Sequence, residues 1–182
     1  MASVLVPLAQ GCEELESVTV IDLLRRAGID VTTAGLDARP VTASRGVVLV
    51  PDTTLDEALK KDYDMVVLPG GLPGADHLDQ DPRIQTLLKK MADSEKFTAA
   101  ICAAPKALAS AGLLDGKRAT AYPGTLEKLN LATTTMAAEP VVKDGKVITS
   151  RGPGTAMDFA LALIETLAGT EKRETVEAGL VR

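Results

Sequence analysis

Residues 97–112 read FTAAICAAPKALASAG, an apolar strand that passes directly into a helix with Cys102 at the junction. Pro105 can occupy the first helical turn, and Gly112 is typical of a helix end. The alanines beside the cysteine suit a crowded turn, in which only small side chains fit. The segment therefore predicts a nucleophile elbow, although the Gly-x-Ser-x-Gly pattern of hydrolases is absent.

The position of Cys102 predicts its chemistry in two different ways. A thiol there faces the positive end of a helix dipole and free backbone N–H groups, which favour thiolate, so Cys102 would react near neutral pH. The alternative is a small buried hydrophobic residue, because unpaired cysteine is among the most buried residue types. The residues of this segment leave both interpretations open.

On either side of this segment, short apolar runs alternate with amphipathic stretches, which is typical of an α/β fold with a mainly parallel sheet. Expected strands are residues 4–8, 31–35, 47–50, 64–68, 98–101 and 147–149. Expected helices are residues 14–27, 55–61, 83–92, 105–111, 156–168 and a last helix capped by Thr170. Asp144-Gly145 indicates the turn of a hairpin between two short apolar runs.

The composition fits one globular domain, residues 1–182, with 46% hydrophobic and 25% charged residues. A net charge of −5, scattered basic pairs and 2% aromatic residues argue against nucleic acid as a partner. The apolar runs are too short to cross a membrane, and the N-terminal residues have no basic region typical of a secretory signal. We expect a cytoplasmic protein with reduced thiols.

The titratable residues exclude several kinds of site. A single histidine, His77, rules out multi-histidine zinc sites, and we expect no metal or other cofactor. His77 lies in GADHLDQD, which we interpret as a solvated loop. Cys12 is too far from Cys102 in sequence for a CxxC pair, and it is a packing residue or, alternatively, a secondary thiol that resolves an oxidised Cys102.

Three glycine-containing segments follow expected strands: GCEELE (11–16), PGGLPG (69–74) and TSRGPGT (149–155). Such glycines either form tight turns or let backbone N–H groups approach a ligand at the carboxyl edge of the sheet. One of Glu13, Glu14 and Glu16 could face Cys102, and burial would raise its pKa so that it gives and takes protons. TSRGPGT lacks the Gly-Lys-Ser/Thr ending of a nucleotide-binding loop, which excludes ATP and GTP.

Six motifs, in order along almost the whole chain, resemble the ThiJ/PfpI superfamily, in the branch of the parkinsonism-associated deglycase and bacterial YajL. These motifs are GCEELE (11–16), RRAGI (25–29), SRGV (44–47), YDMVVLPGG (63–71), AAICAAP (99–105) and TSRGPGT (149–155). The resemblance implies a flavodoxin-like, three-layer α/β sandwich and a homodimer.

The resemblance also assigns roles to residues. It implies that Cys102 is the nucleophile, that Glu16 is a protonated carboxyl hydrogen-bonded to its sulfur, and that the N–H groups of Gly71 and Ala103 form an oxyanion hole. The further positions that it places at the substrate, the site edge or the dimer interface are Gly70, Arg26, Arg45, Tyr122, Gly152 and Pro153.

The sequence also departs from related enzymes. Tyr122 stands where the animal proteins of this branch have a histidine, and Ala103 stands where the intracellular protease branch has one. The chain after Gly112 contains no histidine, unlike amidotransferases of related fold. Peptidase and amidase activities are therefore disfavoured.

The activity implied by the resemblance is that of a cofactor-free glyoxalase III or deglycase, with methylglyoxal, glyoxal or their early adducts with thiols and amines as substrates. A rival hypothesis makes Cys102 the oxidisable thiol of a redox sensor or oxidative-stress chaperone. A third leaves the fold as a scaffold with an inert cysteine.

Overall fold

The core of the molecule is a seven-stranded sheet. The structure is a computed structural model, and it describes all 182 residues. Six strands run parallel, and only the edge strand β10 is antiparallel to its neighbour. The order across the sheet is β10 (Val141–Asp144), β11 (Val147–Ser150), β7 (Phe97–Ile101), β6 (Met65–Leu68), β1 (Ser3–Leu8), β2 (Asp30–Gly35) and β5 (Thr53–Thr54). The predicted α/β class with a mainly parallel sheet is confirmed.

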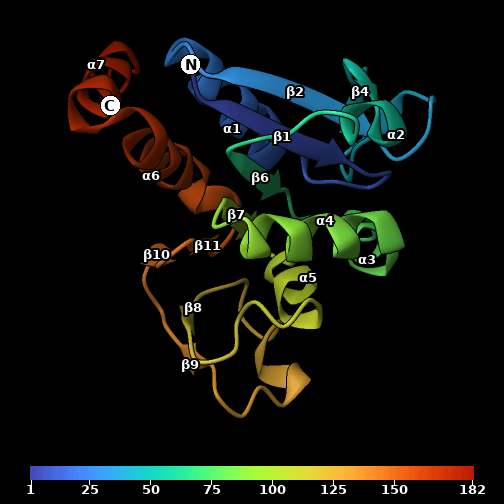
Figure 1. Cartoon of the computed structure of the whole chain (residues 1–182). Coiled ribbons are helices and arrows are strands. Elements are labelled where there is room, and N and C mark those ends of the chain that lie inside the picture. The colour runs from blue at the N-terminus through green and yellow to red at the C-terminus, as the bar shows by residue number, and fades with distance from the viewer.

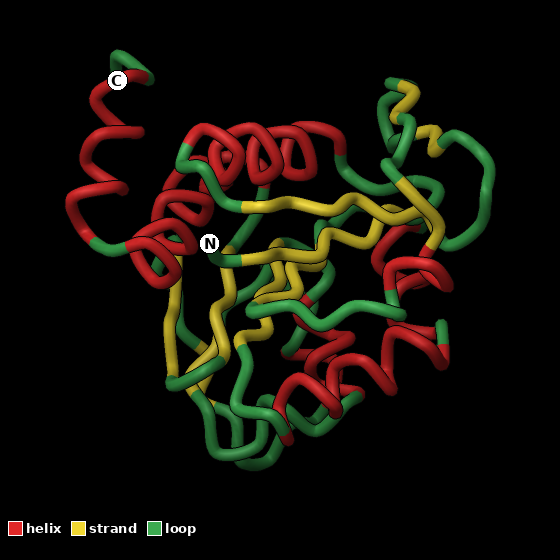
Figure 2. Tube along the Cα trace, turned by 45° about the horizontal axis from the view of Figure 1, so that its top comes forward, coloured by secondary structure: helices red, strands yellow, loops and turns green.

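Helices cover both faces of this sheet, which makes three layers (Figures 1 and 2). One face packs against α1 (Glu14–Arg26), α6 (Ala156–Ala168) and α7 (Thr170–Gly179). The other packs against α2 (Leu55–Ala58), α3 (Gly74–Gln80), α4 (Pro82–Asp93) and α5 (Pro105–Ser110). The flavodoxin-like sandwich implied by the resemblance is therefore present.

Strand β1 shows why the apolar runs are continuous. Val4, Val6 and Leu8 belong to the core under α1 and α6, whereas Leu5 belongs to the core on the opposite face. Successive side chains of a strand point to opposite faces, so a strand covered on both sides needs apolar residues at every position.

Smaller elements complete the fold. Strand β3 (Val41–Thr42) pairs with β4 (Val48–Leu49) in an antiparallel ribbon, and β8 (Arg118–Ala119) pairs with β9 (Thr135–Met136) in a parallel one. Two single-turn 3-10 helices are η1 (Glu127–Leu129) and η2 (Pro153–Thr155). None of the helices has the length and apolar character that a bilayer crossing requires.

Residues 47–50 were expected as a strand of the main sheet, and this prediction is wrong. Only β4 forms there, outside that sheet, and Val48 and Val50 are 59% and 80% exposed. Of the four apolar side chains, only Leu49 packs against the core, whereas the three valines are exposed. The strand that occupies the edge is β5, whose two threonines carry no apolar signal.

Three local predictions also need correction. GADHLDQD is not a loop, because α3 begins at Gly74, and Ala75 and Leu78 are buried on its inner side. Thr170 does not cap α7 but is its first residue, and its hydroxyl donates to Glu165 instead. The hairpin turn is Gly145-Lys146, one residue later than expected, because Asp144 still pairs with Val147.

The order of the strands brings three loops together. Strands β7, β6 and β1 are neighbours in the sheet, and all run in the same direction. The segments that follow them therefore meet at one edge: Cys102 after β7, Gly70 and Gly71 after β6, and residues 9–13 before α1.

Candidate active site

Cys102 sits at the predicted elbow between β7 and α5. Its φ is +65°, a left-handed conformation that is uncommon for a residue other than glycine. The backbone around it is fixed by two hydrogen bonds, since Cys102 N donates to Ser150 O at 3.0 Å and Tyr122 N donates to Cys102 O at 2.8 Å. The side chain is 9% exposed at the base of this edge.

Of the three carboxylates in GCEELE, the structure turns only Glu16 toward the thiol. Glu13 caps α1, because its Oε2 accepts from Glu16 N at 2.8 Å. Glu14 points to the β3–β4 ribbon, where it accepts from Ser44 Oγ at 3.1 Å and from Arg45 N at 2.8 Å. Glu16 is completely buried in the first turn of α1, and its Oε2 accepts from Gly70 N at 2.8 Å.

Gly70 packs against the side chains of both Cys102 and Glu16. A methyl group on its Cα would come within 2.5 Å of Cys102 Cβ, 2.7 Å of Glu16 Oε2 and 2.8 Å of Ile101 O. The backbone at this point thus has room for hydrogen only, which lets the carboxyl group of Glu16 lie directly beside the thiol of Cys102. The Glu16 carboxyl keeps its second oxygen, Oε1, buried and without a hydrogen-bond partner.

Burial changes the titration of both groups. Loss of hydration raises the pKa of Glu16 from 4.5 to about 7, against the opposing effect of the Gly70 N–H. Burial, followed by the negative charge of Glu16, raises the pKa of Cys102 to about 12, against the opposing N–H groups of Gly71 and Ala103. The pKa of Cys102 is therefore raised, whereas the helix N-terminus alone predicts a lowered pKa for this thiol.

The two shifts describe one coupled pair. The carboxylate form of Glu16 opposes a thiolate, whereas the protonated form removes that charge and supplies an O–H donor. A thiolate at Cys102 therefore goes together with a proton on Glu16. The N–H groups of Gly71 and Ala103 stabilise that state, because both lower the pKa of Cys102.

Gly70→Ala tests this packing and is expected to lower the free energy of unfolding by about 1–3 kcal/mol, the usual cost of forcing extra atoms into a packed site. Gly154→Ala is the matched control, because a methyl group there meets no atom within 4 Å. Urea unfolding of both variants measures the difference. Equal stability of the Gly70→Ala and Gly154→Ala variants would mean that the neighbours of Gly70 can move aside without a cost in free energy.

Tyr122 and Gly152 lie against each other next to the elbow. Tyr122 is bonded to the elbow through its backbone N–H, and its side chain is 53% exposed. A methyl group at Gly152 would meet Tyr122 Cδ2 at 3.3 Å, so the ring lies close over the glycine. Pro153 follows in η2.

Comparison with known proteins shows the family to which the chain belongs. The model of the DJ-1/PfpI family matches residues 2–166. This chain belongs to the DJ-1/PfpI family. It is 46% identical over 180 residues to the Parkinson disease protein 7 homolog of Danio rerio, covering 97% of this chain and 95% of that protein. It is 37% identical over 175 residues to the glutathione-independent glyoxalase DJR-1.2 of Caenorhabditis elegans, covering 96% of this chain and 92% of that protein.

The fold agrees with the same family. The crystal structure of Drosophila melanogaster DJ-1beta has a TM-score of 0.94 and 44% identity, covering 99% of this chain and 97% of that one. The chain is also 43% identical over 98% of its length to Protein DJ-1 homolog A of Arabidopsis thaliana, but it spans only 46% of that protein. The resemblance deduced from the six motifs is thereby confirmed.

Several predicted positions of this DJ-1/PfpI member lie away from the elbow. Arg26, at the end of α1, pairs with Asp22 at 3.0 Å, and Arg45 is an exposed residue beside Glu14. Cys12, by contrast, lies in the loop that packs against Gly71 at the site edge; it is buried and unpaired, and burial raises the pKa of its thiol. His77 is an exposed residue of α3 that lines a different cavity.

The sequence did not single out Ser150, whose carbonyl accepts the Cys102 N–H. Any residue type presents such a carbonyl, so composition carries no signal for it. The strand register of β11 and β7, in which Ser150 pairs with Ile101, is what places it there.

Proposed function

We propose that this protein is a cofactor-free glyoxalase or deglycase acting on methylglyoxal, glyoxal or their early adducts with thiols and amines. The observation that supports this best is a buried carboxyl group, Glu16, with a pKa of about 7, which lies directly beside the side chain of a cysteine at an elbow. A relative with 37% identity is named a glutathione-independent glyoxalase. We also propose a cytoplasmic location, where the thiols of Cys12 and Cys102 would stay reduced.

In the first step, the Cys102 thiolate adds to the aldehyde carbon of methylglyoxal, and the carbonyl π electrons move to oxygen. The N–H groups of Gly71 and Ala103 stabilise the resulting alkoxide as an oxyanion hole. Glu16, protonated in this state, transfers its proton to the alkoxide, which gives a hemithioacetal and leaves a carboxylate.

In the second step, the Glu16 carboxylate removes the C–H proton of the former aldehyde carbon, and the electrons of that bond form an enediolate. The hydroxyl proton passes from the first oxygen to the second, and Glu16 returns its proton to the adjacent carbon, which regenerates a C=O at the sulfur-bearing carbon. The product is a lactoyl thioester of Cys102. Water cleaves this thioester and releases lactate and the thiol, so methylglyoxal and one water become lactic acid. A carboxyl group with a pKa of about 7 suits both directions of proton transfer at neutral pH.

The test is the formation of lactate from methylglyoxal by purified protein without glutathione. We expect lactate in proportion to protein concentration and its loss after alkylation of Cys102. The same assay on a preformed adduct of methylglyoxal with N-acetyl-lysine separates a deglycase, which consumes the adduct faster than it dissociates, from a glyoxalase. If folded protein forms no lactate from either substrate, the proposed function is wrong.

That negative outcome would favour the redox hypothesis. Mild peroxide followed by mass spectrometry then distinguishes the remaining roles. A gain of two oxygens confined to Cys102 supports a sensor, in which the N–H groups of Gly71 and Ala103 stabilise a sulfinate. A Cys102 that neither oxidises nor reacts with iodoacetamide at neutral pH supports an inert scaffold.

We also propose that the protein forms a homodimer through α1 and the β3–β4 ribbon. The exposed apolar residues Leu15 and Val18 lie on α1, and Val48 and Val50 lie on or beside β4. A groove of about 350 Å³ that both Val18 and Val50 line joins the two elements. An apolar surface of this kind marks an interaction site.

Val50→Asp is expected to weaken dimerisation at least about tenfold, because it buries an unpaired charge in the interface. Val181→Asp is the matched control, since Val181 is 92% exposed at the far end of α7. Light scattering coupled to gel filtration gives the mass of each variant. A wild-type protein that stays monomeric at high micromolar concentration would contradict the proposed dimer.

A further inference from the structure

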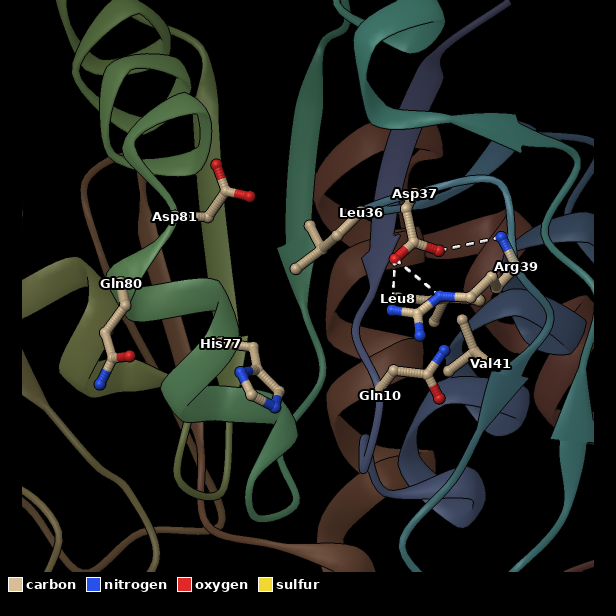
Figure 3. A pocket seen from close by; sticks show the side chains of 9 residues that line it. All are labelled: Leu8, Gln10, Leu36, Asp37, Arg39, Val41, His77, Gln80 and Asp81. Atoms are coloured by element: carbon tan, nitrogen blue, oxygen red, sulfur yellow. Dashed lines mark hydrogen bonds and ion pairs between the residues drawn. The ribbon is translucent and has the colours of Figure 1, made fainter.

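A second cavity, of about 310 Å³, opens at the carboxyl ends of β1 and β2 (Figure 3). One wall is α3, and the other is the end of β1 with the segment from β2 to β3. None of Cys102, Glu16 and Gly70 lines it. Within the sheet, β2 lies on one side of β1 and β6 lies on the other. The connections from β1 to its two neighbours therefore diverge, and the cavity adjoins this switch point, at which open α/β sheets bind ligands.

The charged groups of the cavity neutralise one another. Asp37 pairs with Arg39 at 2.6 Å, and Asp81 pairs with Arg83 at 2.6 Å. Both lining carboxylates thus already have a guanidinium partner, although Arg83 also pairs with Asp56 at 2.8 Å. A strongly anionic or cationic ligand would therefore gain little there and would lose its hydration.

Of the remaining hydrogen-bonding side chains in the cavity, two have no partner within the protein and one is held in place by the backbone. The side chains of His77 and Gln80 make no hydrogen bond within the chain, and Arg39 Nη1 is also free. Gln10 is held in place, because its amide donates to Pro40 O and accepts from Thr42 N, both at 2.9 Å. Figure 3 shows these groups on opposite sides of the cavity.

The floor is apolar. Leu8 and Val41 are each 2% exposed and lie beneath the polar rim, and Leu36 stands beside them. The cavity thus combines donors and acceptors on its walls with an aliphatic base. Hydroxyl groups match the walls, because each can donate and accept, and the C–H faces of the same molecule match the base.

We propose that this cavity binds a neutral polyhydroxylated ligand of pentose size. Its volume corresponds to about ten water molecules at ~30 Å³ each, which suits a ligand of about ten non-hydrogen atoms. His77 and Gln80 supply hydrogen bonds from α3, and Arg39 supplies them from the opposite wall. The site is separate from the proposed chemistry at Cys102 and does not depend on it.

The single histidine makes the test direct, since its imidazole gives one set of NMR signals. Titration of the intact protein with methyl β-xyloside, which has no free aldehyde to react with Cys102, is expected to shift the His77 signals with saturation. Protein alkylated at Cys102 should bind equally well. If alkylation abolishes binding, the probe occupies the other site and the inference is wrong.

Gln80→Ala and Arg39→Ala are expected to weaken binding at least fivefold. Lys89→Ala, an exposed change outside the cavity, should leave it unchanged. Binding by the two variants is followed through the same His77 signals. A shift that never saturates in the wild type, or tighter saturation by inorganic phosphate than by the xyloside, would overturn the inference.

Discussion

Cys102→Ser is expected to lower the glutathione-independent turnover of methylglyoxal by about 10³-fold or more, the scale of loss when a nucleophile is removed. The substitution is nearly isosteric, but a hydroxyl ionises far less readily than a thiol. A carboxylate with a pKa of about 7 is too weak a base to produce a serine alkoxide. The oxyanion hole would remain, with no nucleophile to form an oxyanion.

Cys12→Ala is the matched control, because it removes the other buried thiol of the chain. It should retain turnover within about threefold when both variants are compared at equal folded fraction. Lactate formation and circular dichroism provide the two measurements. A Cys102→Ser protein that keeps a tenth of the wild-type rate would show that the cysteine is not the nucleophile.

The parts of the fold that were predicted correctly are those in which burial dictates residue type. Strands β1, β6 and β7 are apolar at almost every position because helices cover both of their faces. The elbow was predictable for a similar reason, since small residues and Pro105 around Cys102 reflect a steric requirement of the turn. Both patterns involve residues that are close together in the chain, so they can be recognised from the sequence alone.

The parts that were missed depend on contacts between distant segments. Helix α3 has two buried apolar residues, Ala75 and Leu78, and its packing against neighbouring helices compensates for a weak periodic pattern. From the residues alone, Glu13, Glu14 and Glu16 were alternatives, and only the family resemblance pointed to Glu16; its place beside Cys102 follows from the orientation of α1 over the sheet. The raised pKa of Cys102 required the knowledge that Glu16 lies beside it.

Glu16→Gln is expected to change the pH dependence of stability. The pKa of Glu16 is about 7 in the folded protein and 4.5 as the ordinary value, so the folded state binds the proton more tightly than the unfolded state. Stability from this proton is complete below pH 4.5 and is lost as the pH rises through 7. The loss amounts to about 3 kcal/mol.

Glutamine carries no proton to lose, so the variant should unfold at higher urea than the wild type at pH 8 and lose this difference near pH 5. Glu127→Gln, an exposed change on η1, is the control and should follow the wild type at every pH. Urea unfolding across this pH range makes the measurement. Parallel curves for Glu16→Gln and wild type would contradict a proton held at Glu16.

The same variant is expected to lose turnover by about 10²–10⁴-fold, the usual contribution of a general acid–base group. The amide oxygen of glutamine can still accept from Gly70 N, so the loop keeps its anchor. What disappears is the proton that accompanies the thiolate and later moves between the two substrate carbons. Greater stability at pH 8 together with lost turnover would show that the buried charge is retained for chemistry at a cost to folding, whereas full turnover would exclude Glu16 as the proton carrier.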